Sequence, residues 1–104
     1  MKQRPPMTHD IKTHREFFDL WITRQKSFEV RLNDRDYRSG DTIRSHELDP
    51  ATGKLTGRVG IGNVVYVLEG FKGLAPKFCV VECPFLKMVV KHHGQPEADL
   101  NGAG

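Results

Sequence analysis

The sequence predicts a single α+β domain that is mostly β: five or six short strands in a small barrel or strongly curled sheet, with one N-terminal helix packed on it. Three observations lead to this. One helical apolar pattern occurs, early in the chain. Short β-branched segments separated by turn residues follow at spacings of about ten residues. A chain of 104 residues, of which 38% are hydrophobic and 28% charged, has room for one modest core.

The N-terminal part is expected to hold a flexible segment, a strand and the helix. Residues 1–7 are polar and contain a Pro-Pro pair, so we expect them to be flexible. Residues 8–12 form a candidate first strand. Thr13 followed by Glu16 has the form of a capping box, which predicts a helix from residue 13 to residue 25. The aromatic side chains of this helix follow helical spacing and are expected in the core.

The remainder of the domain, which we place at residues 8–91, is predicted to consist of strands and turns. Alternating polar and apolar residues, or β-branched runs, indicate strands at 27–32, 42–48, 55–62 and 64–69, and one or two further strands within 78–88. The run 64–69 is the most strongly β-branched and is predicted to be a central strand. Pro84 indicates a strand edge or a bulge. Residues 92–104 lack core-forming content and are expected to be a flexible tail.

The charge balance favours an anionic partner. The formal net charge is +3 and the pI is about 9.0, a lean toward nucleic acid or another polyanion. No stretch approaches the roughly 18 apolar residues of a membrane span. The basic N-terminus has no apolar segment behind it and does not resemble a secretory signal. We therefore expect a cytoplasmic protein without a membrane partner, monomeric by default.

The cysteines and histidines do not predict a metal site or a cofactor. Cys79 and Cys83 would lie roughly 13 Å apart along one strand, too far for a disulfide. They are best interpreted as small apolar residues on one strand face. The five histidines share no ligand spacing with the cysteines.

The segment from residue 24 to residue 41 holds the residues most suited to chemistry. Five of its eighteen residues are Arg or Lys, three are Asp and one is Glu. Strand alternation places Glu29 and Arg31 on one face, able to pair with each other or to meet one ligand. Lys26 has the opposite parity and would have to reach that site from the turn between helix and strand. The alternative is an exposed salt-bridged strand with no ligand.

The pattern Lys26-x-x-Glu29-x-Arg31 after a helix, followed by a turn ending in Gly40-Asp41, resembles the signature of ASCH domains. The run Lys-Ser-Phe-Glu-Val-Arg-Leu-Asn-Asp-Arg-Asp-Tyr-Arg-Ser-Gly-Asp-Thr is most similar to a family of short phage and bacterial proteins of unknown function. The likeness extends in order over about residues 8 to 86. One departure is Arg24, which stands where that family usually has glycine.

The resemblance implies a PUA-like barrel with a basic cleft between helix and barrel that takes RNA, another single strand or a nucleoside. Arg31, Arg35 and Arg38 would then contact phosphates, beside Lys26 and Glu29. Glu29 could accept hydrogen bonds from a base amino group. A base could stack on Tyr37, which suits this role better than Trp21, a residue of the helix's apolar stripe.

Two other functions stay open. Some small ASCH-like proteins are amidohydrolases acting on N4-acylated cytidine, and Lys26 stands at the matching lysine. Glu29 stands where those enzymes carry threonine. The further carboxylate would come from Glu69 or Glu82, and Lys26 would act as a base. The third possibility is a phage-encoded adaptor that binds a host protein, which leaves no mark in the sequence.

Overall fold

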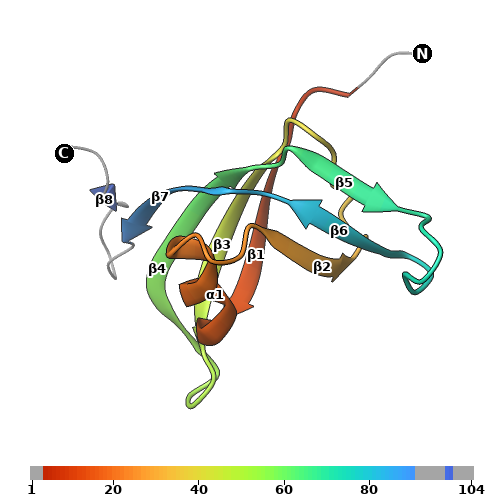
Figure 1. The fold of residues 1–104 in the computed structure, drawn as a ribbon. Helices are drawn as coiled ribbons and strands as arrows, with labels where there is room; N and C mark the ends of the chain where they lie inside the picture. The colour runs from red at the N-terminus through yellow and green to blue at the C-terminus, as the bar shows by residue number, and fades with distance from the viewer. Residues whose placement is uncertain (1–3, 91–97, 100–104) are drawn as a thin grey trace.

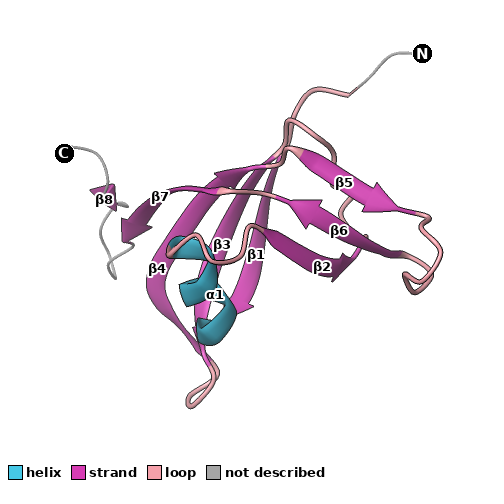
Figure 2. Ribbon diagram, in the orientation of Figure 1, coloured by secondary structure: helices cyan, strands magenta, loops and turns pink. Residues whose placement is uncertain are grey.

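The computed structural model describes residues 4–90 and 98–99, which form two β-sheets and one helix (Figures 1 and 2). The first sheet has the order β1-β3-β4-β7-β8 and the second the order β2-β6-β5. The elements in chain order are β1 (Thr8–His14), α1 (Arg15–Ile22), β2 (Phe28–Leu32), β3 (Thr42–Asp49), β4 (Lys54–Asn63), β5 (Tyr66–Glu69), β6 (Phe78–Glu82), β7 (Phe85–Val90) and β8 (Ala98–Asp99). The mostly β, α+β class is confirmed.

The strand pairings do not close into one barrel. β1 pairs in parallel with β3, and the other pairings are antiparallel. Among the described residues, β1 ends the first sheet on one side and β2 ends the second, and the two are not paired with each other. The hydrophobic core takes side chains from both sheets, such as Ile11, Ile43 and Val81. The molecule is thus two curled sheets around a common core, with a seam between β1 and β2.

The predicted start of the helix is wrong. Thr13 belongs to β1, where it is opposite Glu47 of β3, and its hydroxyl hydrogen bonds to that of Ser45. The helix begins two residues later, after His14, without a side-chain cap. β1 alternates buried and exposed residues through its whole length, with Thr13 on the buried face. Pairing with β3 therefore outweighs the local capping signal.

The helix ends in a Schellman motif that explains the departure at Arg24. Gln25 N–H donates to the carbonyl of Leu20 at 2.9 Å and Arg24 N–H to that of Trp21 at 3.0 Å. Arg24 has a φ of 62°, the left-handed region that favours glycine. Its side chain compensates in part by donating to the Phe85 carbonyl at 3.0 Å and lying over the Phe85 ring. The turn leading to Lys26 therefore forms despite the missing glycine.

Two glycines of β4 make room for the helix. A Cβ at Gly60 would lie 2.5 Å from the Trp21 ring, and one at Gly62 would lie 2.7 Å from the Pro84 carbonyl oxygen. The Trp21 indole N–H donates to the carbonyl of Cys83 at 2.6 Å. The expectation that the helix aromatics belong to the core is confirmed for Phe18, which is buried, and for Trp21, which packs against the core, but it is wrong for Phe17, which is 42% exposed. The Gly60-Ile-Gly62 sequence serves packing.

The strand from residue 64 is not central. β5 pairs only with β6 among the described strands and is an edge of the second sheet. The region 78–88, predicted to hold one or two strands, holds two, β6 and β7, which lie in different sheets. Pro84 stands between them, and the register of β4 against β7 shifts at Gly62, opposite Phe85. The expected irregularity at Pro84 is thus the point where the chain changes sheet.

Two buried carboxylates hold the loops and the helix. Asp41 accepts hydrogen bonds from Arg4 at 2.9 and 2.8 Å, and its carboxylate also contacts His9 at 2.8 Å. Glu47 accepts from Arg58 at 2.9 and 2.6 Å. Arg58 also reaches Asp19 of α1 at 3.1 Å, which ties the helix to the first sheet.

The chain termini are only partly described. Arg4, in the segment expected to be flexible, is anchored on Asp41. The expected tail from residue 92 lies mostly outside the described residues, and within it Ala98–Asp99 pair with β7 as β8. Within residues 4–90 and 98–99, no helix has the length and hydrophobicity needed to cross a membrane.

Candidate functional site

A groove lies where the two sheets fail to meet. Its volume is about 530 Å³, and its walls come from the end of β1, from α1 and from β2. We call it the seam groove. It is lined by Lys12, Thr13, His14, Phe17, Lys26, Glu29, Val30, Arg31, Leu32 and Phe78. Its three Lys and Arg side chains face a single carboxylate, so the groove is basic.

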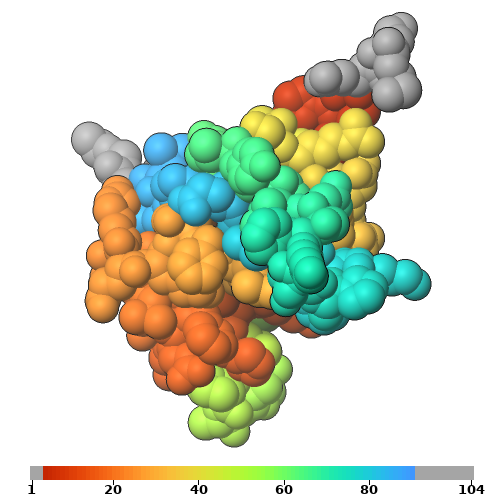
Figure 3. All heavy atoms as spheres, turned by 45° about the vertical axis from the view of Figure 1, so that its right-hand side comes forward, coloured from red at the N-terminus to blue at the C-terminus, as the bar shows by residue number. Residues whose placement is uncertain are grey.

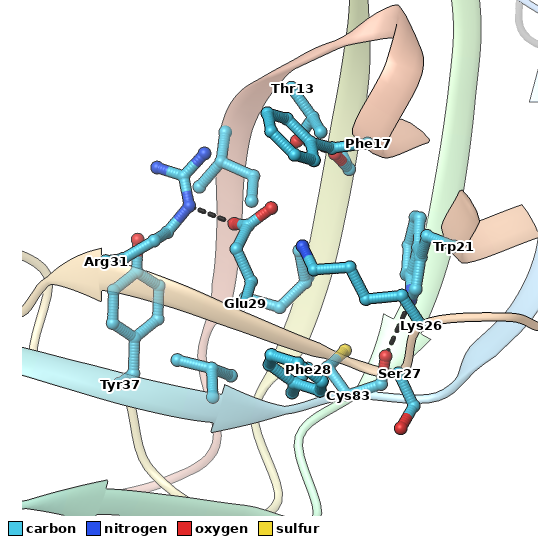
Figure 4. A pocket seen from close by; sticks show the side chains of 14 residues that line it. Thr13, Phe17, Trp21, Lys26, Ser27, Phe28, Glu29, Arg31, Tyr37 and Cys83 are labelled. Atoms are coloured by element: carbon cyan, nitrogen blue, oxygen red, sulfur yellow. Dashed lines mark hydrogen bonds and ion pairs between the residues drawn. The ribbon is translucent and has the colours of Figure 1, made fainter. Parts of the chain in front are cut away.

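Lys26 reaches the groove from the turn after the helix, as expected for a residue whose strand alternation differs from that of Glu29 and Arg31. Its backbone N–H donates to the Leu20 carbonyl at 3.1 Å, which fixes the turn. Its ammonium lies 5.0 Å from the ring centroid of Phe17 and 5.6 Å from that of Phe28. A cation at such distances is attracted by both ring faces. Figure 4 shows the Lys26 and Glu29 side chains pointing into the same space below Phe17.

Glu29 and Arg31 form an ion pair on the inner face of β2, as strand alternation predicted (Figure 4). Arg31 also donates to the carbonyl of Lys12 at 2.7 Å, so one guanidinium bridges the seam between β2 and β1. Burial of Arg31 works to lower its pKa, but the neighbouring Glu29 carboxylate outweighs this and the pKa is raised. The guanidinium is therefore a permanent cation in the groove.

A smaller inner cavity of about 30 Å³ continues from the groove into the core. The two spaces share five lining residues: Thr13, Phe17, Lys26, Glu29 and Arg31. The inner cavity has room for a water molecule or a small ligand group. Tyr37 lines it and is only 3% exposed, with its ring against His9 at 4.8 Å between centroids.

The Tyr37 hydroxyl is buried without a hydrogen bond of good geometry within the described part of the chain, and the Arg31 guanidinium lies beside it. Burial raises the pKa of Tyr37, and the positive charge of Arg31 acts in the opposite direction. A buried, neutral hydroxyl without a partner is costly, by roughly 1–3 kcal/mol. It is therefore a donor available to a ligand or a water molecule in the inner cavity.

The structure brings together three of the predicted site residues and separates the others. Lys26, Glu29 and Arg31 line both spaces. Tyr37 lines only the inner cavity, and its buried ring leaves no face for the expected stacking. The two arginines of the following loop, Arg35 and Arg38, are exposed and line neither space, and Arg38 pairs with Asp36 at 2.9 Å.

The carboxylates considered for catalysis lie elsewhere. Glu69, at the exposed end of β5, accepts a hydrogen bond from Asn33 at 2.7 Å and lines neither space. Glu82 of β6 also lines neither space. It is paired with Phe28 of β2, and both side chains lie on the outer face of the second sheet. Cys79 and Cys83 are buried free thiols, and burial raises the pKa of Cys83 to about 12. No group of residues suited to a metal ion occurs in the described ranges.

The sequence did not reveal the contribution of β1 to the site. Lys12, Thr13, His14 and Phe17 line the groove, but Thr13 was assigned to a helix cap. Residues 8–14 contain a single apolar residue, Ile11, so the sequence offered no alternation that would extend the strand, and the burial of His9 and Thr13 is seen only in the structure.

Comparison with a curated protein gives one informative relative. The chain is 42% identical over 50 residues to a protein of Escherichia phage P2 described as "Uncharacterized 12.9 kDa protein in GpA 3'region". The alignment covers 48% of this chain and 44% of the phage protein, so it spans less than half the length of that relative.

Comparison with family models covers most of the domain. The model described as "Domain of unknown function (DUF3850)" matches residues 8–83, which run from β1 through β6 and include the seam groove. The chain therefore belongs to the DUF3850 family of domains of unknown function.

Proposed function

We propose that the protein is an ASCH-like domain of the PUA-like type that binds single-stranded nucleic acid, with one nucleotide in the seam groove. The observation that carries the proposal is the convergence of Lys26, Glu29 and Arg31 on one open groove. An exposed, salt-bridged strand without a ligand would not need Lys26 to reach the same space from another element.

The size and charge of the groove suit a nucleotide. A volume of about 530 Å³ lies within the range of roughly 300–1,000 Å³ common for ligand pockets. Lys12, Lys26 and Arg31 supply cations for phosphate oxygens. Glu29 supplies an acceptor for a base amino group, and the unpartnered Tyr37 hydroxyl supplies a donor below it. The groove thus offers both the phosphate contacts and the polar groups that a base edge requires.

The arrangement of the sheets supports a PUA-like architecture with an open seam. Two curled sheets share one core, and α1 packs against β1, β3 and β7. The helix and β2 border the groove, which is where the family resemblance implies a cleft. In this interpretation the unpaired edges of β1 and β2 are the entrance to the site.

The amidohydrolase alternative has less support from the geometry. It requires a carboxylate besides Glu29, and both Glu69 and Glu82 lie outside the groove. Glu29 itself is paired with Arg31. Binding is therefore proposed rather than catalysis.

The test is fluorescence anisotropy with a labelled 12-nucleotide single-stranded RNA at salt concentrations from 50 to 200 mM. Binding should weaken with salt, and each phosphate neutralised should contribute about −0.7 to the slope of log affinity against log salt. Lys26→Met keeps the apolar stem and removes the charge, so it should weaken binding and reduce that slope by about 0.7. Lys54→Met is the matched control, because Lys54 is an exposed lysine that lines neither space.

The proposal fails if the intact protein binds no single strand, or if Lys26→Met and Arg31→Gln bind with the affinity and salt slope of the intact protein. Incubation with N4-acylated cytidines separates the alternatives. Product that forms with the intact protein and disappears with Lys26→Met would favour catalysis instead.

A further inference from the structure

The outer face of the second sheet is apolar and open to solvent. The register places Phe28, Glu82 and Tyr66 in one row across β2, β6 and β5, and Leu32 beside Phe78 in another. The three aromatic side chains on this face are exposed: Phe28 by 48%, Tyr66 by 59% and Phe78 by 38%. Figure 3 turns this side of the molecule forward, and β2 in orange adjoins atoms of β5 and β6 in green to blue.

Both faces of this sheet therefore carry side chains suited to packing or binding. The inner face supplies Cys79 and Val81 to the core and Glu29 and Arg31 to the groove. An open sheet normally presents polar side chains on the face that it leaves to solvent. A contiguous exposed apolar patch marks an interaction surface.

The outer face is continuous with the seam groove. Val30, Leu32 and Phe78 belong to the outer face and also line the groove. The Lys26 ammonium lies over the Phe17 ring on the groove side and over the Phe28 ring on the outer face. A chain leaving the groove past Lys26 would therefore meet the rings of the outer face directly.

We infer that the outer face is a stacking platform, on which Phe28, Tyr66 and Phe78 hold bases of the strand whose neighbouring nucleotide lies in the seam groove. This inference rests on the proposed function and extends it from one nucleotide to several. Aromatic side chains on a sheet surface bind single strands by stacking, largely without regard to sequence.

The rings are far enough apart for each to stack with a different base. Phe28 and Tyr66 are two strand spacings apart, about 10 Å. Phe78 lies about 13 Å from the row that holds them, because it is four residues along β6 from Glu82, the member of that row on β6. Both separations are well above the stacking distance between adjacent bases, about 3.4 Å. The rings therefore act as separate platforms, which suits a flexible single strand and not a rigid duplex.

The charge near the face favours nucleic acid over a second copy of the chain. Lys26 borders Phe28 and the exposed Lys77 directly precedes Phe78, so two lysines flank the face, against one carboxylate, Glu82, that lies on it between Phe28 and Tyr66. The chain carries a formal net charge of +3. Two copies packed through this face would bring like charges together, whereas a polyanion is attracted to them.

The test compares a 12-nucleotide single strand, as RNA and as DNA, with a mononucleotide and a 12-base-pair duplex. Phe28→Leu, Tyr66→Leu and Phe78→Leu keep an apolar surface and remove the ring. Each should weaken binding of the 12-nucleotide strand by roughly five- to a hundredfold. Tyr66 lines neither the groove nor the inner cavity, so Tyr66→Leu should leave mononucleotide binding unchanged. Phe71→Leu is the matched control, because Phe71 is an exposed aromatic residue of the β5–β6 loop, outside the face.

Two results would overturn the inference and leave the groove assignment intact. One is a 12-nucleotide affinity that the three ring variants do not change, while Lys26→Met still lowers it. The other is a dimer of the intact protein, seen by sedimentation, that Phe28→Asp dissociates. Failure of the intact protein to bind any strand would instead remove the proposed function, and the platform with it.

Discussion

At the scale of single residues, Tyr37 and Arg24 hold positions that are unfavourable in isolation. The Tyr37 hydroxyl is buried without a partner, and Arg24 adopts a left-handed backbone conformation. Tyr37 lines the inner cavity beneath the seam groove, and Arg24 lies in the turn that leads to Lys26. Unfavourable local choices of this kind are concentrated at functional sites.

Tyr37→Phe should leave the free energy of unfolding unchanged or raise it by up to about 1–3 kcal/mol, because it removes a buried hydroxyl that has no partner. The same change should weaken binding of the groove ligand by roughly two- to tenfold, the loss of one hydrogen bond. Urea denaturation and anisotropy measure the two effects. A clear loss of stability would show that the hydroxyl is bonded in solution.

Arg24→Gly should change the free energy of unfolding by less than about 1 kcal/mol. Glycine removes the left-handed backbone cost, while the bond to the Phe85 carbonyl is lost. Arg24→Ala keeps the backbone cost and also loses the bond, so it should be less stable than Arg24→Gly by about 1 kcal/mol. Equal stabilities for the two variants would contradict the role assigned to the φ of 62°. Urea denaturation of both variants measures the difference.

At the scale of elements, the contact between α1 and β4 requires glycine at positions 60 and 62, because Trp21 occupies the space where a Cβ atom would lie. Gly60→Ala and Gly62→Ala should each destabilise the protein by about 1–3 kcal/mol through overpacking against Trp21. Trp21→Leu should relieve the effect of Gly60→Ala more than that of Gly62→Ala, because the Pro84 carbonyl oxygen also obstructs Gly62. A double-mutant cycle from urea denaturation tests this difference. Strict additivity at both positions would contradict the packing described.

The elements themselves were largely predictable, because their signals are local. The strands starting at residues 28 and 42 and the turn at Asp49–Lys54 follow from alternation and turn chemistry. The first residue of α1 was not predictable, because Thr13, which has the sequence pattern of a helix cap, instead pairs with Glu47 of β3. The edge position of β5 depends on which strands it meets, and this is a property of the tertiary fold.

At the scale of the whole molecule, two buried carboxylates connect segments far apart in sequence. Hydrogen bonds from Arg58 lower the pKa of Glu47 to about 2, against the opposing effect of burial. Burial also works to raise the pKa of Asp41, but bonds from Arg4 and His9 outweigh it and the pKa is lowered. Their burial was not predicted, because neither strand parity nor composition identifies the partners of a charged side chain.

Acid should therefore unfold this protein through these groups. A carboxylate with a lowered folded-state pKa is protonated first in the unfolded chain, so its contribution is complete above the unfolded pKa and falls toward the folded one. For Glu47 the window runs from about pH 4.5 down to about pH 2. Urea midpoints should fall across it, and less steeply in Glu47→Gln. An identical pH dependence in that variant would exclude Glu47 as the cause.

The candidate site was predictable to the extent that it lies on one strand. Glu29 and Arg31 share a face because they are two residues apart, and Lys26 follows from its place in the turn. Lys12 and His14 come from β1 and precede Glu29 by fifteen or more residues, and only the seam brings them to the groove. The exposed arginines of the loop shared the same basic segment, but the loop turns them away from it.

The bridge from Arg31 to the Lys12 carbonyl has a further consequence for how a ligand enters. The guanidinium connects β2 to β1 by this hydrogen bond, and the same nitrogen could instead donate to a phosphate oxygen of a ligand. A phosphate that takes this donor breaks this hydrogen bond between β2 and β1, so ligand binding and the loss of the bond are thermodynamically linked. Backbone amides at the end of β1 should then exchange hydrogen at different rates in the free and bound protein.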